Sequence, residues 1–198
     1  MKKKNRVFRV IKKRRTIRKF KEKPIAMDIL KKCLLAGSMA PSAGNLQPLE
    51  FILVEKMKLA MSRCLRWAAY LEEAGPRLAE ELPYAYIVVI SNKKISADAK
   101  YDVGLAVANI VLTATAENVA TCIIGNIDRE NLAILLELPK NYQIELAVAL
   151  GYSAQKSKAT SHRGSPAYFF EKGVLRVPKK NVGKISHKEF FKRHKEEK

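Results

Sequence analysis

The sequence predicts a sandwich of helices and a mixed sheet of four strands, in the α/β or α+β class. Four short apolar runs of strand length alternate with longer segments that have helical periodicity. Proline and glycine fall at the boundaries between these segments, where they end or introduce regular structure. The length of 198 residues and the apolar content of 47% are sufficient for one domain with a sizeable core.

The first half of the chain is expected to contain two long helices and one strand. A helix over residues 28–40 follows from apolar residues at helical spacing, and Pro48 then introduces a strand over residues 49–54. A second amphipathic segment covers residues 58–71, and a short helical piece after the Gly75-Pro76 break ends near Leu82.

The second half begins with a strand over residues 85–90, which Pro83 opens. A charge-poor helix over residues 101–118 follows, and its small residues would let another helix approach closely. The remaining elements are a strand over residues 121–124, a helix over 129–136 and a strand over 144–150.

The polar segment from Ser153 onward cannot bury much of its own surface. We therefore expect residues 153–198 to form an extended arm that wraps a neighbour, within a single domain that covers residues 1–198 and has basic tips at 1–9 and 188–198.

The loop of residues 40–48 is the most informative motif. It places two prolines, a glycine, a serine and two amide side chains between a predicted helix and a predicted strand. Prolines restrict the backbone and glycine relieves it, so the loop should be rigid and should present Ser42, Asn45 and Gln47. Amide groups carry both donors and acceptors, which suits the edge of a heteroaromatic ring.

A second cluster, Arg14-Arg15-Thr16-Ile17-Arg18, lies near the N-terminus. Guanidinium groups bind phosphate with two parallel hydrogen bonds, and a hydroxyl adds a further donor. A basic run is also typical of a solvated surface, and the cluster taken alone fits either interpretation.

The two clusters together resemble the FMN-dependent nitroreductase family, in which an Arg-Arg-Ser-Ile-Arg-like start precedes a helix and an Ala-Pro-Ser-x-x-Asn-x-Gln-Pro loop. The likeness continues in Asp102-Val103-Gly104, Gly125, Gly151-Tyr152 and Val177-Pro178-Lys179-Lys180, and it spans roughly residues 10–190. It implies a three-layer α/β/α sandwich and an obligate homodimer whose C-terminal arms are exchanged. Two FMN molecules would then lie at the interface, each touched by both chains.

The resemblance also implies roles for individual residues. The phosphate and pyrimidine side of FMN would be held by Arg14, Arg15, Thr16 and Arg18. The flavin and ribityl chain would be lined, from the partner subunit, by Pro41, Ser42, Ala43 and Asn45, with Gln47 as a further polar contact. The backbone near Gly125, after Ile124, would donate an N–H to flavin N5, and Arg163, Lys179 and Lys180 are candidates for closing over the phosphate. Lys179 and Lys180 fit a solvated tail nearly as well.

Three positions depart from the family pattern. Ile124 stands where many members have an acidic residue, although a backbone donor at Gly125 is indifferent to that side chain. Leu49 replaces a common tryptophan, and residues 118–121 replace a glycine-rich turn. These departures bear on substrate choice and pocket shape.

The net charge of +19 is concentrated at the two ends: residues 1–23 carry +12, residues 155–198 carry +9, and the middle carries −2. One phosphate does not account for this excess, which fits solubility or attraction to anionic partners. The ends lack the interleaved aromatic residues of a nucleic-acid platform, so nucleic-acid binding is not expected.

No signal peptide or membrane-spanning run is visible, and three cysteines without metal-like spacing indicate buried thiols, so we expect a cytoplasmic protein without a metal site. All three histidines lie in the polar tail, and no Cys-His or Ser-His-Asp set is apparent. A flavin carries its own redox chemistry and needs no such catalytic side chain.

The leading hypothesis is an oxidoreductase in which NADH or NADPH reduces FMN and leaves before a nitroaromatic, quinone or similar small acceptor enters. The alternatives are a specialised member of the superfamily, such as a dehalogenase with a lid in residues 56–83, a flavin-binding protein with little turnover, or a basic nucleic-acid-binding protein. The sequence does not choose between NADH and NADPH.

Overall fold

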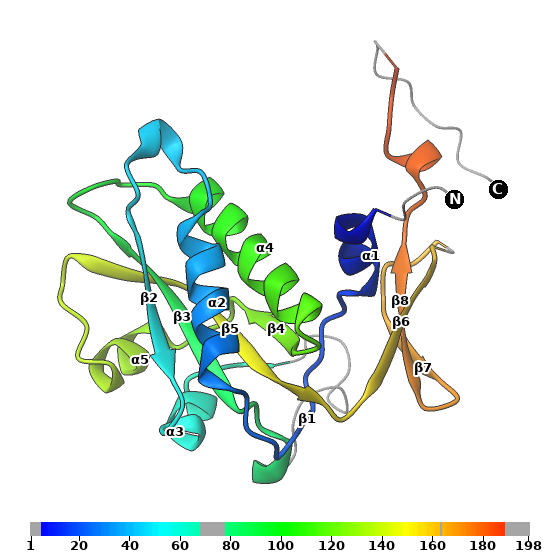
Figure 1. The fold of residues 1–198 in the computed structure, drawn as a ribbon, viewed down its shortest axis with the longest axis horizontal. Helices are drawn as coiled ribbons and strands as arrows, with labels where there is room; N and C mark the ends of the chain where they lie inside the picture. Colours follow the sequence, from blue (N-terminus) through cyan, green and yellow to red (C-terminus); the bar gives the residue numbers. More distant parts are fainter. Residues whose placement is uncertain (1–4, 68–77, 163, 189–198) are drawn as a thin grey trace. The chain divides into compact units, whose positions relative to one another are not determined.

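The computed structural model describes residues 5–67, 78–162 and 164–188. The chain divides into two compact units, Met1–Gln155 and Lys156–Lys198 (Figure 1). The helices of the first unit are α1 (Arg6–Lys13), α2 (Met27–Ser38), α3 (Lys58–Arg63), α4 (Lys100–Ala116) and α5 (Arg129–Leu135), with 3-10 turns at Ala43–Asn45 and Ala79–Glu81. Its strands are β1 (Phe20–Lys21), β2 (Leu49–Val54), β3 (Ala85–Asn92), β4 (Ala120–Ile124) and β5 (Tyr142–Ser153).

These five strands form one sheet in the order β1-β5-β3-β2, with β4 also paired to β5. The expected mixed sheet of four strands is therefore wrong in two details. Strand β1 adds a fifth member, and all four ladders are antiparallel. A single parallel bridge joins Thr16 to Thr121, at the start of β4.

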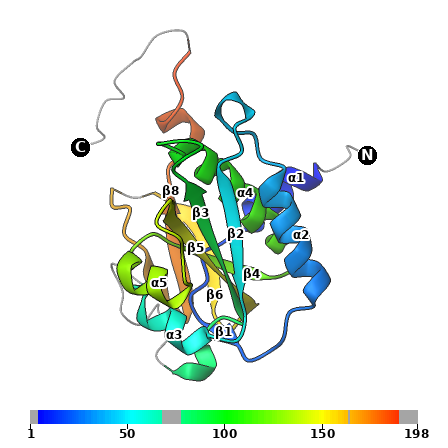
Figure 2. The same cartoon turned by 90° about the vertical axis from the view of Figure 1, so that its left-hand side faces the viewer.

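The first unit has three layers, as the resemblance implied. Helices α2 and α4 cover one face of the sheet and α3 and α5 cover the other (Figure 2). Strand β3 shows the reason: Ile87 and Val89 point into the core beneath α2 and α4, whereas Val88 and Ile90 point into the opposite core. Because both of its faces are covered, β3 is apolar nearly throughout instead of alternating.

Each of the four predicted strands and each of the long helices after Pro24 is present, with ends shifted by a few residues. The predicted helix over residues 58–71 is too long: α3 ends at Arg63, and Leu65 forms an antiparallel β-bridge with Ile127 instead. Residues 68–71 lie outside the described part of the chain. Helix α1 was not expected. It begins at Asn5, whose side chain accepts the backbone N–H of Phe8, and it ends as the arginine cluster begins.

The second unit contains a small sheet of three strands in place of a simple extended arm. Its strands are β6 (Lys156–Ser161), β7 (Phe169–Glu171) and β8 (Val174–Lys179), in the order β6-β8-β7. A 3-10 turn at Val182–Lys184 follows. Alternation in β8 buries Leu175, and Arg176 pairs with Glu171 at 2.7 Å.

Candidate functional site

The arginine cluster lies between helix α1 and strand β1, and it is held against the start of strand β4. Ile17 is buried and donates its backbone N–H to the carbonyl of Thr121 at 2.9 Å. Because neighbouring side chains of extended backbone point to opposite sides, burying Ile17 turns Thr16 and Arg18 away from the core. The segment is therefore anchored by one apolar residue and exposes its polar neighbours.

A glutamine at the end of the first unit fixes the same segment. The Gln155 side-chain oxygen accepts the backbone N–H of Arg18 at 2.6 Å and that of Lys19 at 3.0 Å. Its amide nitrogen is buried without a hydrogen-bond partner, as is the hydroxyl of Thr121. Both groups are fully buried, so they do not themselves offer a surface to a ligand.

Two of the three arginines of the cluster, Arg14 and Arg18, place their charges near strand β4. Burial raises the pKa of the Cys122 thiol to about 11, and the nearby Arg18 and Arg14 guanidinium groups oppose this rise. Arg15 instead turns back onto the end of α1, where its guanidinium donates to the carbonyls of Arg14 and Lys12. Burial and the adjacent Arg14 lower the pKa of Arg15. Thus Arg14 and Arg18 lie together beside β4, and Arg15 is engaged with the backbone.

Strand β4 connects this cluster to the predicted glycine. Thr121, Ile123 and Gly125 lie on one face of the strand, while Cys122 and Ile124 lie on the other and are buried. Ile123 is 43% exposed, so α2 and α4 do not cover this part of the sheet. Gly125 lies four residue steps of extended chain after Thr121, or about 13 Å.

Gly125 is exposed, and the fold itself does not demand a glycine there. A Cβ atom added at Gly125 would meet only Leu146, at 3.4 Å, which is an ordinary contact. A side chain at position 125 would therefore fit in an isolated copy of the chain. The position is open to the close approach of another molecule to the backbone.

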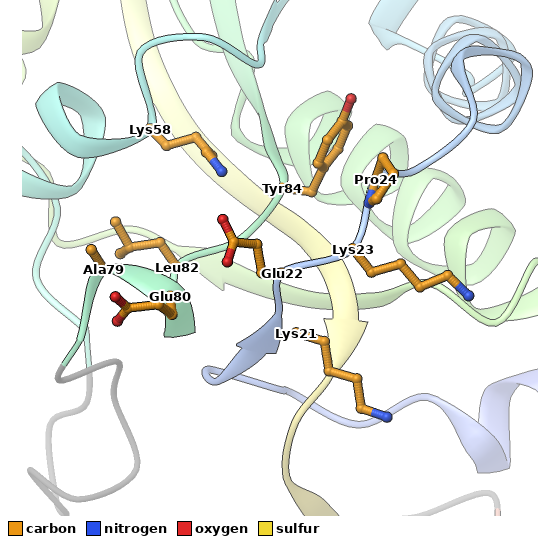
Figure 3. Close-up of a pocket in the computed structure, with 9 residues that line it drawn as sticks. All are labelled: Lys21, Glu22, Lys23, Pro24, Lys58, Ala79, Glu80, Leu82 and Tyr84. Carbon is orange, nitrogen blue, oxygen red and sulfur yellow. The ribbon is translucent and has the colours of Figure 1, made fainter.

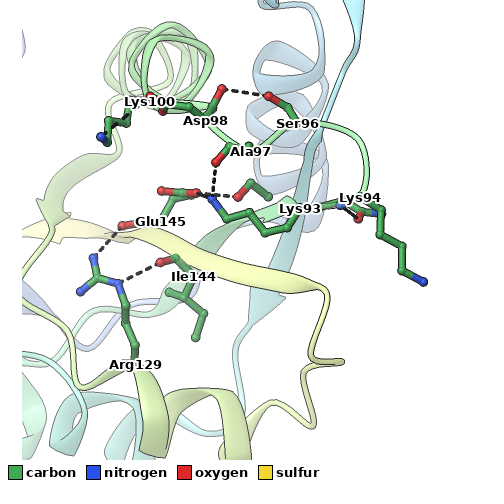
Figure 4. Close-up of polar contacts among 11 residues, drawn as sticks. Lys93, Lys94, Ser96, Ala97, Asp98, Lys100, Arg129, Ile144 and Glu145 are labelled. Atoms are coloured by element: carbon green, nitrogen blue, oxygen red, sulfur yellow. Dashed lines mark hydrogen bonds and ion pairs between the residues drawn. The ribbon is translucent and has the colours of Figure 1, made fainter.

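Arg129 contacts the segment around Gly125. From the first turn of α5, its guanidinium donates to the Ile144 carbonyl at 3.0 Å and to the Glu145 carbonyl at 3.3 Å (Figure 4), with a longer contact of 3.5 Å to the Gly125 carbonyl. The Glu145 carboxylate in turn accepts the Ser91 hydroxyl at 2.5 Å and lies 3.7 Å from the Lys93 ammonium. Helix α5 and strands β3 and β5 thus support the turn that follows β4.

The loop of residues 40–48 is closed by hydrogen bonds within it and has unusual backbone angles. Gly44, Asn45 and Gln47 all have positive φ angles, of 56°, 55° and 51°. The backbone N–H of Gln47 donates to the Ser42 hydroxyl at 3.0 Å, and the backbone N–H of Asn45 donates to the Ser42 carbonyl at 3.0 Å. Left-handed backbone at non-glycine residues is uncommon and tends to occur at functional sites.

Two hydrogen bonds fix this loop to the rest of the unit: the Asn92 N–H donates to the Pro48 carbonyl at 2.9 Å, and the Ala43 N–H is bound by a side chain of α4. The Asp102 carboxylate, in the first turn of α4, accepts the backbone N–H of Ala43 at 3.1 Å. Asp102 also lines a hollow of about 150 Å³ together with Pro41, Ser42 and Gln47.

Within one chain, the loop and the arginine cluster lie at opposite ends of helix α4. The loop is tied to Asp102 near the beginning of the helix, whereas Lys13 hydrogen-bonds Asn118 just beyond its end, at 2.6 Å. Residues 102 and 116 are about 21 Å apart along a helix axis. The structure therefore places Arg14, Thr16 and Arg18 at the start of β4, with Gly125 about 13 Å farther along the strand, and it places Ser42, Ala43, Asn45 and Gln47 in another region.

Helix α4 also has a face that its own chain leaves exposed. Tyr101, Gly104, Leu105 and Ala108 recur at helical spacing and are exposed, to 88% at Tyr101 and 46% at Leu105. A Cβ atom added at Gly104 would have no heavy atom within 4 Å. An apolar helix with small residues on an open face is suited to pack against another helix.

The remaining candidates lie in or beyond the second unit. Lys179 ends β8 and accepts the backbone N–H of His162 through its carbonyl, and Lys180 is exposed just after it. Arg163 lies outside the described residues. Sequence reasoning assigned no role to Asp102, Arg129 or Gln155, since each acts on residues far away in the chain.

A second hollow, of about 200 Å³, lies beside β1 (Figure 3). Lys58 and Glu22 point toward one another across it, whereas the Lys23 ammonium turns away to the Tyr152 ring, at 4.6 Å from its centroid. Opposite charges at an exposed hollow do not favour one class of ligand.

Among the described residues, no group of three acidic, histidine or cysteine side chains is placed to hold a metal ion. The described helices include none with the length and apolar character needed to span a bilayer. Cys33, Cys64 and Cys122 are free and buried, which confirms the expectation for the thiols.

Comparison with known proteins agrees with this geometry. A relative from Archaeoglobus fulgidus, named after NADH dehydrogenase and NAD(P)H nitroreductase activity, is 33% identical over 152 residues, covering 70% of this chain and 80% of its own. A nitroreductase family protein from Clostridium novyi NT has a TM-score of 0.66 at 30% identity, covering 75% of this chain and 87% of its own. An FMN-dependent nitroreductase from Clostridium difficile R20291 has the same fold, with a TM-score of 0.70 at 24% identity over 92% of this chain and 98% of its own.

The model of the Nitroreductase family matches residues 11–152, which include the arginine cluster, the loop of residues 40–48 and Gly125. The chain belongs to the nitroreductase family.

Proposed function

We propose that this protein is an FMN-dependent oxidoreductase that takes hydride from NADH or NADPH and passes the electrons to a nitroaromatic, quinone or similar small acceptor. FMN held by Arg14, Thr16 and Arg18 would supply the two-electron redox chemistry that links the nicotinamide to the acceptor. The two substrates would use the same site in turn.

The observation that carries the proposal is the arrangement along strand β4. Arg14 and Arg18 gather at its beginning, where Thr16 forms a β-bridge with Thr121, and Gly125 is exposed at its end. Arginine donors and the Thr16 hydroxyl suit a phosphate, and an open backbone position about 13 Å away suits the close approach of a flat ring. The uncovered strand face between them is suited to one extended molecule with a phosphate at one end.

The residues of this chain have distinct tasks in that site. Arg14, Thr16 and Arg18 hold and orient the phosphate. The backbone N–H near Gly125 donates toward flavin N5, and such a fixed dipole stabilises charge as it develops without any titratable group. No side chain among the candidates is assigned proton transfer.

The loop of residues 40–48 completes the site from a second copy of the chain. Within one chain the loop is anchored at the other end of α4 from the arginine cluster. A two-fold dimer through the exposed face of α4 would supply each cluster with the partner's loop, because a two-fold contact is reciprocal. The face is apolar and contains small residues, as a close helix contact requires.

FMN binding and its phosphate dependence test the proposal directly. The Arg18→Ala variant should lose FMN affinity about tenfold or more, and the loss should shrink at high salt because a charge-assisted contact is removed. Riboflavin, which lacks the phosphate, should be affected much less. Arg63→Ala is the matched control, since it removes the same charge from an exposed position on helix α3, outside the arginine cluster.

Turnover is tested by anaerobic mixing of the FMN-loaded protein with NADH or NADPH, followed by a panel of quinones, nitroaromatics and halogenated aromatics. Loss of flavin absorbance with a nicotinamide and its return with an acceptor support the oxidoreductase. A protein that binds FMN but is not reduced by either nicotinamide contradicts it. Equal losses of FMN and riboflavin in Arg18→Ala contradict the phosphate assignment.

A further inference from the structure

We propose that Asp102 is a positioning residue whose buried carboxylate holds the loop of residues 40–48 in its flavin-binding conformation. The inference rests on the proposed function, because it assigns the loop to a flavin site. It concerns a residue that touches the loop and not the flavin itself.

The burial of Asp102 is the first observation. Only 5% of the residue is exposed, and of the side chains in the described part of the chain that are buried, it alone carries a formal charge. Burying a carboxylate is costly unless hydrogen bonds and nearby dipoles compensate for the lost water. Asp102 has both forms of compensation: the Ala43 N–H, and its place in the first turn of α4, where the helix dipole favours negative charge.

The conformation of the loop is the second observation. Three of its residues have left-handed backbone, and Gln47 is one whose side chain disfavours it, whereas Gly44 and Asn45 tolerate it. Such backbone persists only where the surroundings fix it. The internal hydrogen bonds to Ser42 close the loop on itself, whereas the bond to Asp102 fixes it to the sandwich. Without Asp102 the closed loop would lose its attachment to helix α4.

The position of the hollow beside the loop is the third observation. Asp102 lines it together with Pro41, Ser42 and Gln47, so the carboxylate lies directly beneath the residues assigned to the flavin. A shift of the loop would therefore alter the binding surface without altering any side chain on it. The arginine cluster is anchored at the far end of α4. A change at Asp102 should therefore leave the contribution of the phosphate to FMN affinity unchanged.

The structure provides two independent ways to break the contact. Asp102→Leu removes the acceptor and leaves an apolar side chain of similar size, whereas Asp102→Asn keeps an oxygen that can accept the Ala43 N–H. Ala43→Pro removes the donor instead. Ser42 is extended, with φ −130° and ψ 156°, which is the backbone that a following proline requires.

The experiment compares FMN and riboflavin affinities of the full-length variants by flavin fluorescence. Asp102→Leu and Ala43→Pro should each weaken both flavins by a similar factor of about tenfold, since the lost contact lies on the ring side. Asp102→Asn should retain affinity within about threefold of wild type. Thr115→Val is the matched control, since it removes a buried polar group from the same helix. The Thr115 hydroxyl donates to the Val111 carbonyl and does not contact the loop.

Each result has a definite meaning. Equal weakening of both flavins in Asp102→Leu, with rescue by Asp102→Asn and no change in Thr115→Val, supports the positioning role. If Asp102→Leu does not fold, Ala43→Pro decides the question by the same measurement. Wild-type affinity for both flavins in either Asp102→Leu or Ala43→Pro overturns this inference and leaves the proposed function standing. A wild-type protein that binds neither flavin overturns the proposed function, and this inference with it.

Discussion

Replacing Gly104 with leucine should separate two copies of the chain without harming either one. Gly104 lies on the exposed face of α4 beside Tyr101, Leu105 and Ala108. A Cβ atom there meets nothing within 4 Å in its own chain, so the added side chain causes no internal clash. Leucine is also favoured over glycine inside a helix by about 0.8 kcal/mol. The isolated fold should therefore be as stable as before, or slightly more stable.

The dimer should respond in the opposite direction. Adding a large side chain to a close-packed contact costs about 1–3 kcal/mol, and a two-fold interface contains the substitution twice. The dimer dissociation constant should rise by at least about thirtyfold, which corresponds to about 2 kcal/mol. Because each proposed site needs the partner's loop, FMN affinity should fall together with the dimer population.

Sedimentation equilibrium over a range of protein concentrations measures the dissociation constant, and urea unfolding measures the stability of the fold. Glu130→Leu is the control, since it adds the same side chain to an exposed position on α5, across the sheet from α4. A Gly104→Leu protein that dimerises as tightly as wild type would refute the assignment of this face to the dimer.

Three further predictions concern the core and the chemical step. Gly151→Ala should destabilise the fold by about 1–3 kcal/mol in urea unfolding, because its Cβ would lie 2.6 Å from the buried Phe20 ring. Unchanged stability would contradict this prediction and show that the Phe20 ring shifts at no cost. The free energy of unfolding should fall as pH rises from 9 toward 11, because burial raises the pKa of Cys122 to about 11 and its thiolate forms first in the unfolded chain. Cys122→Ala should lessen this fall, by up to about 3 kcal/mol at pH 11. Urea unfolding at several pH values measures it, and the same fall in Cys122→Ala as in wild type would contradict the prediction. Gly125→Pro should slow flavin reduction by NAD(P)H far more than it weakens nicotinamide binding, because the backbone donor is lost. His162→Ala should leave the rate of reduction nearly intact, and stopped-flow absorbance measures both variants. A His162→Ala protein that binds FMN but is not reduced would reveal a catalytic group outside the assigned set.

The sequence alone was sufficient for the elements whose signals are local. Strand β3 is a short apolar run bounded by Pro83, and α4 is a long segment with helical spacing of small and apolar residues. The closed loop of residues 40–48 followed from its prolines, glycine and amides, which act on the backbone within a few residues of themselves. Local composition also indicated the free, buried cysteines.

Contacts between distant parts of the chain could be decided only by the tertiary structure. Strand β1 is two residues long and has no periodic pattern, so it exists because it pairs with the end of β5. The small sheet of β6, β7 and β8 likewise depends on pairing between polar segments that show no apolar alternation.

The site shows the same division. The arginines and the loop were recognisable as clusters of donors and acceptors, since side-chain chemistry is written in the sequence. Their separation to opposite ends of α4, the return of Arg15 to its own helix, and the anchoring of Ala43 by Asp102 were not. The separation and the anchoring depend on how α4 packs on the sheet, because packing brings together residues that are 59 positions apart, as for Asp102 and Ala43. The contacts of Arg15 are local, but they depend on where α1 ends, which the basic run does not indicate.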